Sequence, residues 1–353
     1  MLVEEILASA FDGALAEDPS IHYYVPAVPL TKPELVNVIK QQRLRSVSSV
    51  FATLAGGKED PKSKIGLASL LKTIWGSEYD DERDARFIND RVHANIQKDS
   101  TFSVVPRIYG GVTTPAQLRT IADVAEKYNV PMLKITGGQR IDMLGVRKEQ
   151  LPSVWKDLGM PSGHAYTKAV RTVKTCVGEE FCRYGVGDST GLGIKIERKY
   201  QGMESPHKIK MAASGCPRNC AESMVKDVGV VAIEGGRWEI YVGGAAGSSV
   251  RKGDVLCTVD SHDEVLKHIG RFIQYYRENA KYLERTYGFL ERVGIDRLKD
   301  VLVKDSEGIA NRLDAEVERS VDAFQDPWQE GSAPIHPSQF VDSLEPAEAG
   351  SRR

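Results

Sequence analysis

The sequence Thr-Cys-Val-Gly-Glu-Glu-Phe-Cys occupies residues 175–182, and Ser-Gly-Cys-Pro-Arg-Asn-Cys follows at 214–220. The two stretches hold four of the five cysteines as two pairs, Cys176 with Cys182 and Cys216 with Cys220. Each pair is short enough for one loop or helix start to turn both sulfurs toward a common centre. Glycines and small residues surround both pairs, so backbone amides could approach an anionic sulfur cluster closely.

Three kinds of chemistry compete for these cysteines. Disulfides need an oxidising compartment, and nothing in the sequence indicates export. Structural zinc sites usually have about two to four residues between paired ligands, and the Cys176–Cys182 pair is wider than that. An iron–sulfur cluster held by four thiolates suits the count and the glycine-rich surroundings. Spacing therefore favours a cluster and leaves zinc and unligated buried thiols open.

The composition is that of an ordinary soluble globular protein. Of the 353 residues, 41% are hydrophobic and 27% charged, and 47 Lys and Arg against 49 Asp and Glu give a net charge of −2. This balance argues against a nucleic-acid or membrane partner. No apolar run approaches the roughly 20 residues of a membrane span, and the acidic start at 1–6 differs from a signal peptide, so we expect a cytoplasmic protein.

Residues 1–80 are predicted to form a small helical module. Their apolar residues recur at helical spacing, and Thr31 with Glu34 forms a capping-box pair. The predicted helices span 1–16, 33–42, 46–54 and 65–75.

Residues 81–165 are predicted to form a compact α/β unit. Helices are expected at 82–89, 114–128 and 146–155, and strands at 92–96, 103–108 and 132–136. In the second helix Leu118, Ile121 and Val124 are expected to share one buried face.

Residues 166–310 are predicted to form a second domain, which carries the cysteines. Strands are expected at 168–173, 208–213, 228–234 and 238–242, a helix start within 185–193, and helices at 263–279 and 281–293. The fifth cysteine, Cys257, lies in an alternating strand pattern and is predicted to be a buried core thiol. Residues 311–353 are predicted to be a C-terminal helix and a disordered tail.

The cysteine signature, Cys-x5-Cys followed by Gly-Cys-Pro-x-x-Cys, resembles that of the sirohaem- and [4Fe-4S]-containing nitrite and sulfite reductases. The flanking sequence is similar to one branch of that family, the C-terminal sirohaem half of the large subunit of NAD(P)H-dependent assimilatory nitrite reductases. The flanking stretches are Phe-Ile-Asn-Asp-Arg-Val-His-Ala-Asn-Ile-Gln-Lys-Asp (87–99), Val-Val-Pro-Arg-Ile-Tyr-Gly-Gly (104–111), Ile-Thr-Gly-Gly-Gln-Arg-Ile-Asp (135–142) and Asp-Ser-Thr-Gly-Leu-Gly (188–193). The resemblance runs from about residue 25 to about residue 330.

The resemblance implies an α+β fold in which a helical module precedes a ferredoxin-like half-domain and an α/β sirohaem and [4Fe-4S] domain. Residues 1–80 resemble the small [2Fe-2S] domain of the family, residues 81–165 its ferredoxin-like half-domain, and residues 166–310 its sirohaem domain. Because residues 1–80 contain no cysteine, this module is expected to have lost its cluster and to serve in packing or docking.

The resemblance also implies the cofactors. The four paired cysteines would hold a [4Fe-4S] cluster, and Cys220 would also bridge to the sirohaem iron. Arg218 and Asn219, inside the second motif, would donate to cluster sulfides or sirohaem carboxylates. No Gly-x-Gly-x-x-Gly motif follows a predicted strand, so we expect no FAD or NAD(P) site.

Five basic residues are candidates for binding sirohaem carboxylates, because they match family positions beside glycine turns or cysteines. They are Arg107, Arg140, Arg171, Lys208 and Lys210. All but Arg140 would also act on the anionic substrate as catalytic residues. Lys208 and Lys210 are two residues apart on a predicted strand and so share a face. His93 and His207 are candidate proton carriers.

The function implied is the six-electron reduction of nitrite to ammonium. Sulfite reduction in the same pocket is the alternative within the family. The alternative from another class is a truncated chain that binds a cofactor or partner without turnover.

The resemblance also bears on partners. The flavin and nicotinamide modules of the branch are absent and Met1 falls partway into a family domain, so electrons are expected from a separate protein or subunit. Duplicated family members have two half-domains and this chain shows one. We therefore expect a homo-oligomer, or pairing with a related chain, across an exposed sheet edge.

Overall fold

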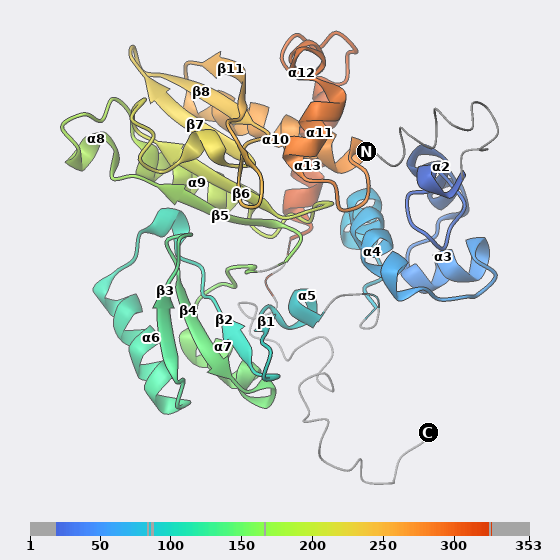
Figure 1. Ribbon diagram of the computed structural model, residues 1–353, viewed down its shortest axis with the longest axis horizontal. Helices are drawn as coiled ribbons and strands as arrows, with labels where there is room; N and C mark the ends of the chain where they lie inside the picture. The colour runs from blue at the N-terminus through green and yellow to red at the C-terminus, as the bar shows by residue number, and fades with distance from the viewer. Residues whose placement is uncertain (1–18, 83–84, 86–87, 166, 325, 327–353) are drawn as a thin grey trace, which may run out of the picture.

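The computed structural model describes residues 19–82, 85, 88–165, 167–324 and 326. These residues form an α+β fold with three hydrophobic cores, one for each of three successive parts of the chain (Figure 1). The helix predicted at 1–16 and the tail beyond 326 lie outside the described residues. None of the described helices is long and apolar enough to cross a membrane.

The first part, the helical module, consists of α2 (Lys32–Gln42), α3 (Val47–Leu54) and α4 (Pro61–Trp75), with short 3-10 turns η1 (Pro19–His22) and η2 (Gly76–Glu78). The predicted cap of α2 is confirmed, because the backbone N of Thr31 donates to Glu34 at 2.8 Å and its hydroxyl does so at 2.7 Å. Helix α4 begins four residues earlier than predicted, since the Asp60 carboxylate accepts from the backbone N of Lys62 and Ser63 and so caps it there.

The second part, the four-stranded unit, is an antiparallel sheet with strand order β1-β2-β4-β3. Its helices α6 and α7 share a core with the sheet, in which Ile121 and Trp155 meet Phe102 and Met143. The elements are α5 (Ile88–Val92), β1 (Asn95–Ile96), β2 (Phe102–Val104), η4 (Tyr109–Gly111), α6 (Pro115–Lys127), β3 (Met132–Ile135), β4 (Ile141–Val146), η5 (Lys148–Gln150) and α7 (Leu151–Leu158).

Several boundaries in this unit differ from the prediction. Val92 ends helix α5 and does not begin a strand. Val146 was assigned to a helix but ends β4, because it pairs with Phe102 across the antiparallel ladder. The helix that follows therefore starts at Leu151. Leu118 is 45% exposed, so the buried face of α6 begins one turn later, at Ile121.

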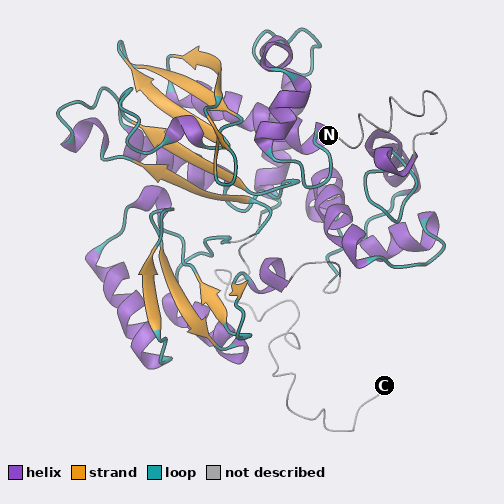
Figure 2. Ribbon diagram, viewed as in Figure 1, coloured by secondary structure: helices purple, strands orange, loops and turns teal. Residues whose placement is uncertain are grey.

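The third part, the five-stranded unit, is a mixed sheet with strand order β11-β8-β7-β6-β5 (Figure 2). Strands β5, β6 and β7 run parallel, whereas β7, β8 and β11 pair antiparallel. Strands β9 (Ala245–Ala246) and β10 (Val250–Arg251) form a separate two-stranded antiparallel sheet. The other elements are β5 (Val170–Thr175), α8 (Gly178–Phe181), α9 (Ser189–Tyr200), β6 (Ile209–Ser214), η6 (Ser223–Val225), β7 (Val228–Ile233), β8 (Arg237–Val242), β11 (Asp254–Val259), α10 (His262–Asn279), α11 (Thr286–Val293), α12 (Ile295–Leu302) and α13 (Ala310–Asp322).

The predicted hairpin at Gly235-Gly236 and the predicted helices α9, α10 and α13 are present, whereas α12 was not predicted. Helix α11 begins later than predicted, after Leu283, whose positive φ of 58° is incompatible with a continuous helix. Cys257 lies on β11 and is half-buried at the rim of the core, so it is less enclosed than predicted. Burial raises the pKa of its thiol to about 12.

The helical module lies against α13 and the C-terminal end of α10 (Figure 1). Two cations make this contact specific. The ammonium of Lys32 donates to the carbonyls of Arg277 and Ala280 at 2.9 and 2.7 Å, at the C-terminal end of α10. In return, Arg319 of α13 donates to the carbonyl of Ile74 at the end of α4, at 2.8 Å. The helical module thus supplies a donor to the last carbonyls of α10, and α13 supplies a donor to a carbonyl at the end of α4. Such terminal carbonyls have no partner within their own helix.

The half-buried Lys32 makes the stability of the fold depend on pH. Burial lowers its pKa to about 7, whereas in an unfolded chain a lysine keeps its proton to about pH 10.4. Between these values the unfolded chain binds the extra proton, so stability rises with pH, by at most about 1.4 kcal/mol per unit from this group. We predict that Lys32→Met removes this rise in urea unfolding measured at pH 7 and pH 9. Lys40→Met, on an exposed position of α2, is the control. Equal pH dependence in the two variants would contradict the assignment.

Candidate functional site

Both cysteine pairs follow the ends of neighbouring parallel strands. Thr175, the last residue of β5, pairs with Ala213 near the end of β6. Because parallel strands end at the same edge of a sheet, Cys176 and Cys216 leave the sheet side by side. The backbone N of Cys176 still donates to the carbonyl of Ala213, at 3.3 Å, so the two strands remain paired up to the first cysteine.

The two cysteine loops interlock through glycines. The backbone N of Gly215 donates to the Sγ of Cys176 at 3.1 Å, and the backbone N of Val186 donates to the carbonyl of Gly215 at 2.7 Å. A Cβ on Gly215 would lie 2.8 Å from the carbonyl oxygen of Gly187 and 3.0 Å from the Cα of Gly178. Only glycine therefore allows this backbone-to-backbone contact.

Helix α9 begins directly beside Cys176. Asp188 caps it by accepting from the backbone N of Gly191 at 2.7 Å. The hydroxyl of Ser189 lies 3.2 Å from the Sγ of Cys176, and it also donates to the carbonyl of that residue, as does Thr190. An amide, a hydroxyl and the positive end of a helix thus surround this sulfur, and all three stabilise an anionic thiolate.

The other three cysteines of the two pairs differ in exposure. Cys216 is buried, Cys182 half-buried and Cys220 exposed. Within the described residues no three Cys, His, Asp or Glu side chains converge as the ligands of a single metal ion do.

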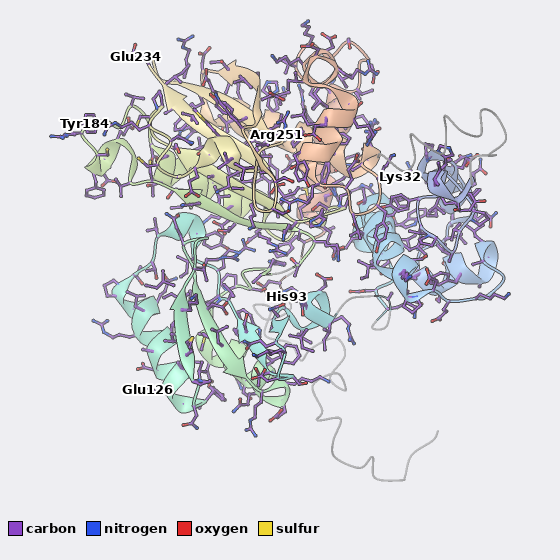
Figure 3. All side chains as sticks on the ribbon, in the orientation of Figure 1. Lys32, His93, Glu126, Tyr184, Glu234 and Arg251 are labelled. Atoms are coloured by element: carbon purple, nitrogen blue, oxygen red, sulfur yellow. The ribbon has the colours of Figure 1, made fainter. Side chains whose placement is uncertain are left out.

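Arg218 and Asn219 contact protein groups in the loops themselves. The guanidinium of Arg218 stacks 4.0 Å from the ring centroid of Tyr184, which lies beside α8 at the far end of the molecule from α2 (Figure 3). The amide oxygen of Asn219 accepts from the backbone N of Met224 at 3.2 Å, and its φ of 57° shapes the turn. Arg218 thus links the two loops and Asn219 fixes the second.

A group of cations lies around the start of β6, the strand that leads to Cys216. Ile209 and Met211 of β6 point into the core, so Lys208 and Lys210 point to the opposite face of the sheet. Burial lowers the pKa of Lys208, and so do the charges of Arg171, Lys210 and Arg285. We call Arg171, Lys208, Lys210 and Arg285 the basic cluster. The sequence prediction identified the first three and missed Arg285, which lies 75 residues further along the chain than Lys210.

The two histidines considered as proton carriers differ in position. His207 accepts at Nδ1 from the backbone N of Lys208 at 2.8 Å, and burial together with nearby cations lowers its pKa to about 3. It is therefore neutral at physiological pH. His93 lies near α5, away from α8 and Tyr184, with its ring centroid 4.9 Å from that of His164 (Figure 3).

Arg107 contacts the backbone of one member of the basic cluster, Arg171, and is fully buried. Its Nη1 donates to the carboxylate of Glu197 at 2.8 Å and to the carbonyl of Arg171 at 2.6 Å. Its Nε donates to the carbonyl of Ser162, and its Nη2 lies 2.7 Å from the Nδ1 of His164. All three nitrogens of the guanidinium thus contact protein groups. The contact with Glu197 joins Arg107, which follows β2, to α9. This geometry does not support the predicted contact of Arg107 with substrate or sirohaem.

Arg140 is also buried but has a donor left over. Its Nη1 donates to the carbonyl of Gly163, while its Nε has no hydrogen-bond partner among the described residues. Burial, followed by the charge of Arg107, lowers the pKa of Arg140 to about 10. An orphaned, buried donor of this kind suits an anionic ligand, as the sequence prediction required of this residue.

Gln139 is a further residue that the sequence prediction missed. Its side-chain amide pairs with the backbone of Thr175 in both directions, donating to the carbonyl at 2.7 Å and accepting from the N at 2.8 Å. This pairing fastens the turn between β3 and β4 to the end of β5, one residue before Cys176.

Two protein-family models match the chain. The model described as "Nitrite and sulphite reductase 4Fe-4S domain" matches residues 166–309, and the one described as "Nitrite/Sulfite reductase ferredoxin-like half domain" matches residues 95–160.

Curated relatives carry corresponding names. "Nitrite reductase [NAD(P)H]" of Bacillus subtilis (strain 168) is 49% identical over 331 residues, which are 93% of this chain and 41% of that protein. "Sulfite reductase, assimilatory-type" of Nitratidesulfovibrio vulgaris is 39% identical over 211 residues, 60% of this chain and 96% of that protein. "Assimilatory nitrate reductase electron transfer subunit" of Bacillus subtilis is 33% identical over 333 residues, 94% of this chain and 41% of that protein. The chain thus spans about two fifths of the length of the first and third relatives.

Solved structures share the fold. The Mycobacterium tuberculosis NirA protein superposes with a TM-score of 0.54 at 18% identity, covering 78% of this chain and 51% of that one. Dissimilatory sulfite reductase I gives a TM-score of 0.50 at 16% identity, covering 71% and 76%.

The interlocked glycines lead to a prediction about metal loading. A methyl group at position 215 would force the two cysteine loops apart, because Gly187 leaves no room for it. We predict that Gly215→Ala binds less than half the iron and acid-labile sulfide of the wild type after anaerobic reconstitution and unfolds at a lower temperature. Gly247→Ala is the matched control, since a Cβ there has nothing within 4 Å and its φ is not positive. Full iron content in Gly215→Ala would show that the loop contact is dispensable.

Proposed function

The chain belongs to the nitrite and sulfite reductase family, and we propose that within it this chain reduces nitrite to ammonium with sirohaem and a [4Fe-4S] cluster. The observation that carries the proposal is the pair of interlocked cysteine loops at the ends of β5 and β6, next to the basic cluster. Nitrite is favoured over sulfite because relatives named nitrite reductases match 85% or more of the chain, at 40% and 49% identity.

The residues at this edge of the sheet suit the two cofactors. We propose that Cys176, Cys182, Cys216 and Cys220 hold the cluster and that the exposed Cys220 also binds the sirohaem iron. When bound, the cluster would pass on electrons from the donor, and the sirohaem would supply the iron at which the anion is reduced. The amide of Gly215 and the hydroxyl of Ser189, both beside the Sγ of Cys176, would stabilise the charge of the cluster.

The basic cluster provides both charge and protons. Reduction of nitrite to ammonium consumes six electrons and eight protons and releases two water molecules, so proton donors are needed close to the anion. Burial and neighbouring cations lower the pKa of Lys208 and of Lys210, which makes each ammonium a better proton donor than a solvated lysine. Arg171 keeps its charge throughout and would hold the anion.

Arg107 and Arg140 take different parts in this proposal. Arg107 holds the backbone of Arg171 at 2.6 Å and so positions that residue without touching the substrate. Arg140 would offer its orphaned Nε to a sirohaem carboxylate. Arg218 and Asn219 would shape the loop around the cluster. Electrons would come from a separate protein, or from a module outside these 353 residues.

The proposal predicts ammonium formation that depends on particular cysteines. Protein reconstituted with iron, sulfide and sirohaem and given an artificial reductant should convert nitrite to ammonium. Cys220→Ser should lose this activity and the coupled absorption of the two cofactors. Cys257→Ser is the matched control, because Cys257 lies on β11 and outside both cysteine loops.

Other outcomes would favour other functions. Faster conversion of sulfite to sulfide than of nitrite to ammonium would identify a sulfite reductase. Cofactors that bind but do not turn over would identify a non-catalytic chain, in line with the name of the relative called an electron transfer subunit. Colourless protein with one zinc per chain would refute the cluster assignment.

We further propose that the functional form pairs two copies of the chain through strand β3. This strand is the edge of the four-stranded sheet, and Met132, Leu133 and Ile135 on it are 55%, 43% and 83% exposed. Apolar side chains on an exposed edge favour pairing with another strand. A second copy suits it because the matching family model is described as a half domain, and because a two-fold axis beside β3 would continue the antiparallel sheet.

The edge strand predicts an effect on assembly. Ile135→Glu should convert a dimer of the reconstituted protein into a monomer in sedimentation velocity, since it places a carboxylate in the strand contact. Val250→Glu is the matched control, because Val250 is 81% exposed on β10 and lies outside this sheet. A fully active wild-type monomer would overturn the proposal.

A further inference from the structure

Arg285 and Asp227 form a connected pair next to Lys210. Asp227 precedes β7 and its side chain is 2% exposed. Both of its carboxylate oxygens accept from the Nη2 of Arg285, at 3.1 and 3.3 Å. The same carboxylate accepts from the hydroxyl of Thr286 at 2.5 Å and from the backbone N of Lys210 at 2.9 Å. One buried carboxylate therefore fixes the guanidinium of Arg285 relative to the strand that carries Lys208 and Lys210.

The charges around this pair are unbalanced. The strongest influences on the pKa of Lys208 besides burial are the cations Arg171, Lys210 and Arg285, and Asp227 is the carboxylate that opposes them. Four cations thus lie close together in a partly buried region, and Asp227 is the carboxylate that acts on both lysines. Neither lysine ammonium has a hydrogen bond or ion pair within the described part of the chain. Like charges held together in this way are unfavourable unless an anion joins them.

The guanidinium of Arg285 has a donor to spare. Its Nε is buried and has no hydrogen-bond partner within the residues that the structure describes, although its Nη2 is held by Asp227. Its side chain is 25% exposed, so the group remains within reach of a ligand. A guanidinium that is held in place on one side and has a donor to spare is well suited to bind a carboxylate or another oxyanion.

We propose that Arg285, oriented by Asp227, is a fourth anion-binding residue of the basic cluster and receives an oxyanion there. The oxyanion is either a carboxylate of the tetrapyrrole or the substrate, since both present the same chemistry to a guanidinium. This inference rests on the proposed function for the identity of the ligand. The anion site itself can be tested without turnover.

The test compares Arg285→Gln with the wild type in two measurements. The first is the affinity of cluster-loaded, sirohaem-free protein for sirohaem, followed by absorbance. The second is the KM for nitrite of the fully loaded protein with an artificial reductant. If Arg285 binds a tetrapyrrole carboxylate, sirohaem affinity falls about tenfold, as expected for the loss of one charge-assisted hydrogen bond. If it binds the substrate, the KM for nitrite rises about tenfold and sirohaem affinity is unchanged.

Arg251→Gln is the matched control for this test. Arg251 has the same 25% side-chain exposure and pairs with Asp254 at 2.8 Å, but it lies on β10. It should leave both measurements unchanged. A folded Arg285→Gln protein with wild-type values in both would overturn the proposal. Were the sirohaem measurement to change in a chain that forms no ammonium at all, the anion site would stand and the proposed function would fail.

Two more variants separate anion binding from a structural role. Arg285→Lys keeps the charge and can keep the pairing with Asp227, so it should fold normally. Because it lacks the forked donors, it should lose at least about threefold in the affected measurement. If Arg285→Gln does not fold, Arg285→Lys replaces it in both measurements. Asp227→Asn should move the same measurement in the same direction, because it releases Arg285 while leaving the cation in the chain. Wild-type values in a folded Arg285→Lys protein, together with an unfolded Arg285→Gln protein, would show that Arg285 is only structural.

Discussion

The parallel pairing of β5 with β6 is the constraint on which the candidate site depends. Each strand is followed at once by a cysteine motif, so the register Thr175 to Ala213 decides which residues of the two loops meet. The loops then contact each other through backbone atoms, with the backbone N of Gly215 donating to the Sγ of Cys176. A slip of one residue would turn every side chain of the strand to the other face and separate the basic residues from the cysteines. The core side chains of β6, Ile209 and Met211, oppose such a slip because they would become exposed.

The contact between the four-stranded and five-stranded units is polar and buried. Arg107 and Glu197 form an ion pair whose two side chains are 0% exposed, and the carboxylate also accepts from the backbone N of Gly110 at 2.9 Å. Removing one partner of such a pair leaves an uncompensated charge and typically costs about 3–5 kcal/mol, although the pair itself adds little net stability. The ion pair therefore acts mainly by holding neighbouring groups in position. It fixes the turn at Gly110 and the carbonyl of Arg171 against α9, and Gln139 does the same for the end of β5.

Features that depend on neighbouring residues could be predicted from the sequence. Features that depend on residues far apart in the chain were partly missed. Helix α2 and its cap follow from Thr31 and Glu34, and the cysteine pairs follow from a motif, because both signals lie within a few residues. Val146 was misassigned because a short apolar run fits a helix or a strand, and only its pairing with Phe102 decides. The roles of Arg107 and Arg285 depend on Glu197 and Asp227, which lie 90 and 58 residues away. No local pattern marks such partners, so an arginine beside a glycine turn was expected to reach a ligand when it is in fact held by protein.

The buried carboxylates explain how the site can hold so much positive charge before any ligand binds. Glu197 and Asp227 each bind one arginine and at least one backbone amide, so each holds one guanidinium and fixes the backbone beside it. Arg171, Lys208 and Lys210 act on one another, and burial together with this repulsion lowers the pKa of both lysines. That repulsion disfavours the folded state. An anion that binds all three cations would remove it, so ligand binding and folding stability are linked at this site. The stability of the folded chain should therefore be lowest when the anion site is empty.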